Sequence, residues 1–248
     1  MPYVMTIPVL RDNFVYLLIE GEHAICIDVG EAGPVLAALR EHKLTLDAIL
    51  ITHTHYDHID GLAALHEQHP CPIMGPPDLD HAATTRHIKD DTEFVIGWAT
   101  LQAITTPGHC PHHLAYHTDD ILFSGDALLT GACGRILGGT PSQLWQSLNR
   151  LMHLPDDTLV YCGHEYTEDN LRFALSILPD DPAITQQLAN VQARLAQGDP
   201  SGPVRLDDEI RTNIFLRSGN PDVVKALNMD DANAEQVFIE LRRRKDHW

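Results

Sequence analysis

The chain has 248 residues, enough for one large domain or for a main domain with a smaller appendage. Hydrophobic residues make up 44% of it, which excludes wholesale disorder. The net charge of -18 argues against a general nucleic-acid or anionic-membrane surface, because both partners need positive patches. The 16 histidines favour a search for a metal site, since histidine is a frequent metal ligand.

The five cysteines are widely spread and form no C-x-x-C pair, so a reducing compartment fits better than a disulfide framework. The N-terminal sequence lacks the basic and apolar regions of a signal peptide, and no apolar run approaches the roughly 18 residues of a membrane span. We expect a cytoplasmic monomer that acts on a small molecule and binds neither nucleic acid nor membrane.

Short apolar runs alternate with helical patterns over the first two-thirds of the chain. The predicted strands are residues 3–10, 14–19, 24–29, 48–52, 72–74, 121–126 and 159–162, with further strands between residues 94 and 116. Turn residues separate the first three strands, which indicates an antiparallel meander. The predicted helices are one opened by Pro34, one over about residues 58–69, and one over residues 142–154 with Ser142 as its N-cap.

The texture of the sequence changes after Glu165. Segments with helical spacing follow, separated by Pro, Gly and Asp breaks: DNLRFALSIL, ITQQLANVQARLAQ, PDVVKALN and AEQVFIELRRRK. We therefore predict two domains. An α/β domain with mixed sheets covers residues 1–165, and a small α-helical domain covers residues 166–248.

The strongest motif is THTHYDH, residues 52–58, which directly follows the apolar run AILI. Residues two apart in an extended chain point the same way, so His53 and His55 can converge on one ion. Asp57 and His58 then fall in the turn that begins the next helix and can face a second ion. These ligand types suit Zn²⁺ or Fe. The alternative is a solvated polar loop that carries its histidines by accident.

Three further residues of the ligand type each follow an apolar run and a glycine: His109 in TPGH, Asp126 in SGD and His164 in CGH. Glycine lets the backbone turn sharply and brings such a side chain close to a shared centre. One such step is common in turns, but three of them and the histidine motif make a coherent set of seven ligands. That is too many for one tetrahedral ion, so we predict two ions about 3.5–4 Å apart and hydrolytic chemistry.

In this order, the motifs resemble those of the metallo-β-lactamase superfamily. The resemblance covers roughly residues 1–165 and implies an αββα sandwich. The ligand sets that it implies are His53, His55 and His109 for one ion, and Asp57, His58 and His164 for the other, with Asp126 bridging both. Asp57 and Asp126 would be catalytic through these two divalent ions. The expected metal is Zn²⁺, with Fe or Mn as alternatives.

Finer features resemble the glyoxalase II (hydroxyacylglutathione hydrolase) family within this superfamily. They are ACGRILGGT (132–140), GHEYT (163–167), NIFLR (213–217) and LRRRKDHW (241–248), and with them the resemblance extends over nearly the whole chain. It implies that the substrate is bound by Arg135, Tyr166, Arg242 and Lys245. Leu137 is a departure, because many relatives have an aromatic residue there.

A run of basic residues, RRRK at positions 242–245, stands out on this acidic chain. Arginine binds carboxylates through two parallel hydrogen bonds, so the run suits a small dianionic ligand such as glutathione. The alternative is a cationic helix C-terminus that the helix dipole stabilises.

The resemblance implies hydrolysis of S-(2-hydroxyacyl)glutathione, typically S-D-lactoylglutathione, to glutathione and a 2-hydroxy carboxylate such as D-lactate. This is the second step of methylglyoxal detoxification. A hydroxide held by both metal ions would attack the thioester carbonyl. The alternatives are glutathione persulfide dioxygenation, hydrolysis of lactones or lactams on the same fold, and a non-catalytic binding module. The last would normally lack a bridging ligand, whereas Asp126 is present.

Overall fold

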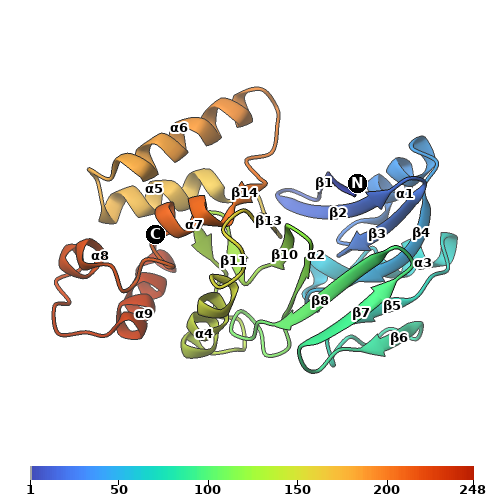
Figure 1. The fold of residues 1–248 in the computed structure, drawn as a ribbon, viewed down its shortest axis with the longest axis horizontal. Coiled ribbons are helices and arrows are strands. Elements are labelled where there is room, and N and C mark those ends of the chain that lie inside the picture. The colour runs from blue at the N-terminus through green and yellow to red at the C-terminus, as the bar shows by residue number, and fades with distance from the viewer. Residues whose placement is uncertain (1) are drawn as a thin grey trace. The chain divides into compact units, whose positions relative to one another are not determined.

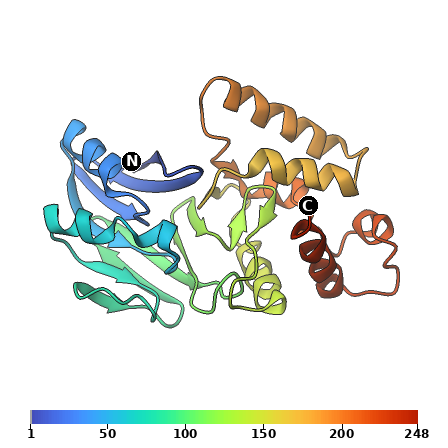
Figure 2. The same cartoon turned by 180° about the vertical axis from the view of Figure 1, so that it is seen from behind.

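In the computed structural model, which describes residues 2–248, the chain forms two compact units. The first unit comprises Met1–Thr105 and His112–Thr118, and the second comprises Thr106–Pro111 and Asp119–Trp248. Figures 1 and 2 show their elements from two sides. The domain border near residue 165 follows a change in the type of secondary structure and stays a prediction.

The first unit contains a mixed sheet with the strand order β1-β2-β3-β4-β5-β6. Its strands are β1 (Tyr3–Val9), β2 (Asn13–Glu20), β3 (His23–Ile27), β4 (Thr45–Leu50), β5 (Ile73–Gly75) and β6 (Thr84–His87). β1, β2 and β3 pair antiparallel, which confirms the predicted meander, and the strands from β3 to β6 pair parallel. The sequence does not predict β6, because its residues are mostly exposed and show no apolar alternation.

Helices of the first unit pack their apolar faces into one core with the strands β1 to β5. They are α1 (Ala32–Glu41), α2 (Tyr56–Ile59) and α3 (Leu62–Gln68). The prediction of a single helix over residues 58–69 is wrong. α2 ends before Gly61, and α3 begins directly after it. The chain lies very close to α1 at this point: a β-carbon on Gly61 would be 2.5 Å from the backbone nitrogen of Ala32.

Another antiparallel set in the first unit consists of β7 (Thr92–Ile96), β8 (Ala99–Thr105) and β9 (Leu114–Thr118). These strands confirm the prediction for residues 94–116. β9 is tied to the segment that follows β4. The backbone nitrogen of Leu114 donates to the Thr52 carbonyl at 2.8 Å, and the buried Tyr116 hydroxyl donates to the Ile51 carbonyl at 2.7 Å. These bonds fix the start of the histidine motif.

The strands of the second unit are β10 (Ile121–Gly125), β11 (Leu128–Leu129), β12 (Ala132–Cys133), β13 (Leu159–Cys162) and β14 (Val204–Arg205). β10 and β13 pair parallel, and β14 pairs antiparallel with β13. β10 and β13 confirm the strands predicted over residues 121–126 and 159–162. β11 and β12 pair antiparallel and form a small turn-back of the chain, called the 128–133 hairpin below.

The helices of the second unit are α4 (Pro141–Leu151), α5 (Thr167–Ile177), α6 (Pro182–Ala196), α7 (Leu206–Thr212), α8 (Pro221–Ala226) and α9 (Ala234–Lys245). α5 and α6 run side by side in both views (Figures 1 and 2). The N-cap of α4 is Thr140, in a capping box with Gln143, so the predicted cap at Ser142 is wrong. Within residues 2–248, no helix has the length and apolar character needed to cross a membrane.

Candidate metal centre and substrate-binding residues

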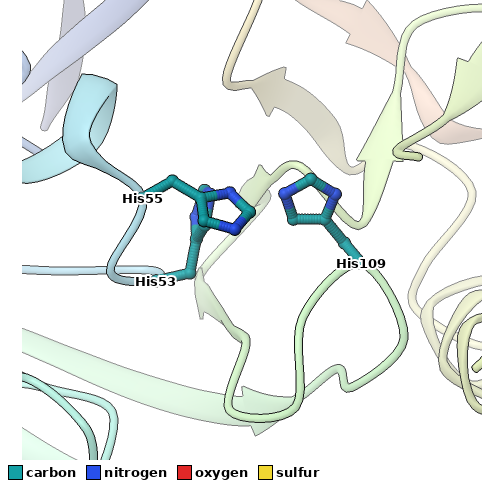
Figure 3. A group of neighbouring side chains, drawn as sticks. All are labelled: His53, His55 and His109. Atoms are coloured by element: carbon teal, nitrogen blue, oxygen red, sulfur yellow. The ribbon is translucent and has the colours of Figure 1, made fainter. Parts of the chain in front are cut away.

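The histidine motif begins just after β4 and continues into α2. β4 ends at Leu50, two residues earlier than predicted, and His53 and His55 lie on the loop that follows (Figure 3). Their rings meet edge to face with centroids 4.6 Å apart, and the His53 ring centroid lies 4.1 Å from that of His58. Asp57 stands in the first turn of α2, with its Oδ2 3.9 Å from His58 Nε2. The first unit thus gathers the four predicted ligands of the motif.

Asp28, which follows β3, supports two of these imidazoles. Its buried carboxylate accepts hydrogen bonds from Nδ1 of His58 and from the backbone nitrogen and Oγ1 of Thr52, each at 2.8 Å. A hydroxyl has one proton, and Thr52 gives it to Asp28. The 2.9 Å contact between Thr52 Oγ1 and His53 Nδ1 is therefore donated by the histidine. In the neutral form of both rings, Nε2 then carries the lone pair that binds a metal ion.

The sequence singles out neither Asp28 nor Asn13 as a site residue. Asn13 starts β2, is buried, and donates from Nδ2 to Oδ2 of Asp57 at 2.9 Å. The available signal for Asp28 is its place directly after the buried strand β3, the neighbour of β4 in the sheet. Asn13 carries no such signal, because asparagine between two strands is ordinary turn composition.

The second unit brings together the three predicted ligands that follow a glycine. Nε2 of His164 lies 3.1 Å from Oδ2 of Asp126, and Nε2 of His109 lies 3.6 Å from the same oxygen. All three side chains are buried. Gly108 and Gly125 have φ angles of 141° and 49°, conformations that favour glycine, so the sharp turns predicted before His109 and Asp126 are present. Asp126 is the common neighbour of both imidazoles.

The chain leaving the 128–133 hairpin passes directly against two of these ligands. The carbonyl of Arg135 accepts a hydrogen bond from Nδ1 of His109 at 2.7 Å, so Nε2 carries the lone pair of this neutral ring as well. A β-carbon at Gly134 would lie 2.1 Å from the Asp126 carbonyl oxygen and 2.9 Å from His109 Nδ1. No side chain fits there, and the backbone supports both ligands at close range.

The donor set of these residues fits divalent metal ions. The His and Asp side chains of both units are of the kind that hold such an ion, and nitrogen and oxygen ligands suit Zn²⁺, Fe or Mn. The hydrogen bonds at Nδ1 of His53, His58 and His109 orient each ring through its second nitrogen, an arrangement common around metal-binding histidines. The arrangement therefore supports metal-assisted hydrolysis.

Two of the predicted substrate-binding residues are accessible. Arg135 is exposed, and Tyr166 is 39% exposed. The Tyr166 ring stacks on that of His164, with centroids 4.8 Å apart and an angle of 6° between the planes. It also lines a pocket of about 390 Å³, whose other lining residues are Glu165, Glu168, Asp169, Arg172 and Leu195. A molecule in this pocket would touch a side chain that packs directly on a predicted metal ligand.

Lys245, in the last turn of α9, is half-buried and forms an ion pair with Asp169. Its ammonium nitrogen lies 5.4 Å from the centre of the Phe173 ring. Burial lowers the pKa of Lys245; Asp169 acts in the opposite direction, and the positive charges of Arg242 and Arg135 lower the pKa further. Arg135, Arg242 and Lys245, called the cationic region below, are thus close enough to act on one another, and Lys245 and Arg242 are also paired with Asp169 and Asp246.

Arg242 is only 4% exposed. Its Nη1 donates to the Cys133 carbonyl at 2.8 Å, its Nη2 pairs with Asp246 at 2.9 Å, and its guanidinium lies 5.3 Å from the centre of the Phe215 ring. Arg242 therefore stabilises the end of the 128–133 hairpin. A direct contact between Arg242 and glutathione stays a prediction.

The thiol of Cys133 is buried beside this arginine and is 2% exposed. Burial raises its pKa to about 11, although the charge of Arg242 acts in the opposite direction. The group is therefore a neutral thiol near pH 7.

Comparisons with known proteins decide the family. The family model described as "Metallo-beta-lactamase superfamily" matches residues 9–164, and the one described as "Hydroxyacylglutathione hydrolase C-terminus" matches residues 165–248. A protein named hydroxyacylglutathione hydrolase from Alkalilimnicola ehrlichii is 42% identical over 99% of both chains. Its namesake from Aeromonas salmonicida is 42% identical over 98% of both. The chain belongs to the hydroxyacylglutathione hydrolase family.

Solved structures show the same fold. ETHE1 from Myxococcus xanthus is similar with a TM-score of 0.67 and 25% identity, over 95% of this chain and 90% of that one. BLEG-1, described as a B3 metallo-β-lactamase, is similar with a TM-score of 0.59 and 28% identity, over 65% and 91%. The chain therefore has the metallo-β-lactamase fold with a helical C-terminal domain, as the resemblance implies.

Proposed function

We propose that this chain is a thioester hydrolase that converts S-(2-hydroxyacyl)glutathione, typically S-D-lactoylglutathione, into glutathione and a 2-hydroxy carboxylate. The observation that carries the proposal is the 38–42% identity, over nearly the full length, to proteins named hydroxyacylglutathione hydrolase. The C-terminal family model also matches this chain, over a region that contains α5 to α9 as well as Tyr166 and Lys245. In this role the chain would perform the second step of methylglyoxal detoxification.

The proposal includes two divalent ions, Zn²⁺ or alternatively Fe or Mn. The proposed ligand sets are the imidazoles drawn in Figure 3, His53, His55 and His109, for one ion, and Asp57, His58 and His164 for the other, with Asp126 shared. Such ions supply activation of water and polarisation of the thioester carbonyl.

The supporting residues of the chain keep this site in order. Asp28 and Thr52 hold the rings of His58 and His53, and the Arg135 carbonyl holds that of His109, so that each ring presents Nε2. Asn13 restrains the carboxylate of Asp57 by its hydrogen bond to Oδ2. Since these partners are fixed before substrate binds, the site needs little reorganisation during the reaction.

Substrate orientation is the proposed role of the cationic region. Arg135 and Lys245 attract the carboxylates of glutathione, and Tyr166 provides an aromatic and hydroxyl contact next to His164. The leaving group is a thiolate, whose conjugate acid has a pKa near 8.5 judged by free cysteine. It departs largely unprotonated, so the reaction requires no separate general acid.

The test is hydrolysis of S-D-lactoylglutathione by the metal-loaded protein. Activity should disappear on chelation and return with added metal. Asp126→Ala should lower kcat/KM by more than the roughly 100-fold typical of residues that only support a metal ligand. The control is Asp231→Ala, which removes an exposed carboxylate of the same unit and should leave the rate unchanged. A metal-loaded parent protein that leaves the thioester intact would refute the substrate assignment.

Assays with other substrates distinguish the proposed reaction from its alternatives. Oxygen uptake with glutathione persulfide, or turnover of a lactone or lactam faster than of the thioester, would replace the proposed reaction by one of the alternatives. We also propose that the protein acts as a cytoplasmic monomer, and sedimentation velocity tests its oligomeric state.

A further inference from the structure

We propose that Glu209 of α7 and Asn213 at the C-cap of this helix are positioning residues for the metal centre, and that they act through the 128–133 hairpin. The inference rests on the proposed function in one respect: it takes Asp126 and His109 as metal ligands. Asn213 lies in the NIFLR segment, to which the reaction described above gives no role.

The hairpin connects Asp126 to Arg135, and residues 127–134 are all buried. Its strands contain only two residues each and pair at two positions, Leu128 with Cys133 and Leu129 with Ala132. So short a ladder cannot hold a hairpin in place by itself. The position of the hairpin must therefore come from other groups.

Ser124 of β10 supplies one of these groups, donating to the Leu128 carbonyl at 2.6 Å, and Glu209 of α7 and Asn213 at its C-cap supply others. Nδ2 of Asn213 donates to the carbonyls of Ala132 at 2.9 Å and Leu129 at 3.4 Å. Oε2 of Glu209 accepts from the backbone nitrogen of Gly131 at 2.9 Å. Asn213 and Glu209 are both completely buried, and they are themselves joined by a 3.1 Å hydrogen bond.

Two further helices contribute one bond each. From α5, Nδ2 of Asn170 donates to the Thr130 carbonyl at 2.9 Å. From α9, Arg242 donates to the Cys133 carbonyl at 2.8 Å. Each residue from 129 to 133 therefore has a backbone group bonded to a side chain of α5, α7, α9 or the α7 C-cap, and Asn213 accounts for two of these contacts.

The hairpin transmits its position to the ligands through the backbone. Gly134 lies so close to the Asp126 carbonyl and the His109 ring that a β-carbon would overlap both, and the next carbonyl, that of Arg135, fixes Nδ1 of His109. A small displacement of the hairpin must therefore move or tilt both ligands. Metal ligands tolerate such shifts poorly, because coordination distances are fixed within about 0.2 Å.

The experiment compares metal binding by Asn213→Ala and by a matched control, Asn220→Ala. Asn220 belongs to the same unit and caps α8 by accepting a hydrogen bond from the Asp222 backbone nitrogen, so Asn220→Ala removes a helix cap and leaves the hydrogen bonds of the hairpin in place. Competition with a chelator and the absorption spectrum of the Co²⁺-substituted protein report on the metal centre without substrate. Asn213→Ala should weaken metal binding roughly 10-fold to 100-fold and alter the spectrum, whereas Asn220→Ala should match the parent.

A second variant, Asn170→Ala, reaches the same hairpin from α5 and should weaken metal binding in the same direction. It decides the matter if Asn213→Ala does not fold. Parental metal affinity in the hairpin variants, or an equal loss in Asn220→Ala, would overturn the inference. Failure of the parent protein to hydrolyse the thioester would instead refute the proposed substrate, because the metal measurements do not depend on it.

Discussion

A single carboxylate, that of Asp28, controls the orientation of two imidazoles in the histidine motif. It binds His58 directly and His53 through the Thr52 hydroxyl. The residue has a φ angle of 59°, in the left-handed region, which aspartate tolerates better than most residues. The backbone at this point therefore adopts a less common conformation that aims a polar side chain into the buried site.

Asp28→Asn tests this role at the level of one atom. The amide keeps the size of the side chain but presents a donor where the carboxylate only accepts, so it competes with the Nδ1 proton of His58. We expect metal affinity and kcat/KM to fall roughly 10-fold to 100-fold. The matched control is Asp47→Asn, which alters an exposed His–Asp pair with His23 in the same unit. Parental metal affinity in Asp28→Asn would contradict the proposed support.

The two basic residues of α9 should respond differently to truncation. Arg242→Ala removes buried charged hydrogen bonds, so the free energy of unfolding in urea should fall by about 2–3 kcal/mol. Lys245→Ala removes a partly accessible charge and should raise KM more than it lowers kcat. Unfolding curves and steady-state kinetics on both variants provide the measurement. A stable Arg242→Ala protein with a raised KM would return Arg242 to direct substrate contact.

At the scale of elements, α7 serves mainly to place two polar side chains. The helix has seven residues, from Leu206 to Thr212, too few to be stable alone, and its fold depends on packing within the second unit. Glu209 faces the 128–133 hairpin from this helix, and Asn213 follows directly at its C-cap. A short helix can thus determine the position of a hairpin that is itself too short to be stable.

The same element carries a pH-dependent contribution to stability. Burial raises the pKa of Glu209 from 4.5 to about 7, although hydrogen bonds from Gly131 and Asn213 oppose the rise. Because the folded state holds this proton more tightly than the unfolded state, stability falls as the pH rises from about 4.5 to about 7 and is then level. Over this pH interval the free energy of unfolding should fall by about 3 kcal/mol.

Glu209→Gln should remove this dependence. The free energy of unfolding of the variant, measured from pH 4.5 to 8, should not show the fall that Glu209 causes in the parent. The variant should therefore be more stable than the parent, most clearly at pH 8. Glu67→Gln, at an exposed position, should follow the parent curve. Parallel curves for Glu209→Gln and the parent would show that Glu209 ionises normally in the folded protein.

Across the whole molecule, the sequence predicts best what leaves a local pattern. The predicted ligands follow strands or glycines, and the three of the second unit do lie together, as do the four of the first. Asp28, Asn13 and Asn213 leave no such pattern, because the groups through which they act on the site are 24 or more residues away in sequence. The burial of Arg242 is equally hidden, since a run of four basic residues is typical of a solvated surface.

The boundaries of the compact units also differ from the domain border that the sequence predicts. The sequence changes from strands to helices near residue 165, whereas the second compact unit already includes residues 119–164. The hydrogen bonds between the 128–133 hairpin and α5, α7 and α9 provide the physical reason. They join strands and helices on either side of the predicted border into one body. Such long-range bonds cannot be read from composition.

The burial of Cys133 has a consequence for thiol–disulfide exchange. Its carbonyl is bonded to Arg242, and Arg242 and Arg135 belong to the cationic region proposed to attract glutathione, so this sulfur lies near the proposed glutathione site. With a pKa of about 11, the Cys133 side chain is the reactive thiolate in only about 0.01% of protein molecules at pH 7. The fraction for a free cysteine is about 3%. Cys133 should therefore resist forming mixed disulfides with oxidised glutathione, and the support that we propose the hairpin gives to the metal site should persist under oxidising conditions.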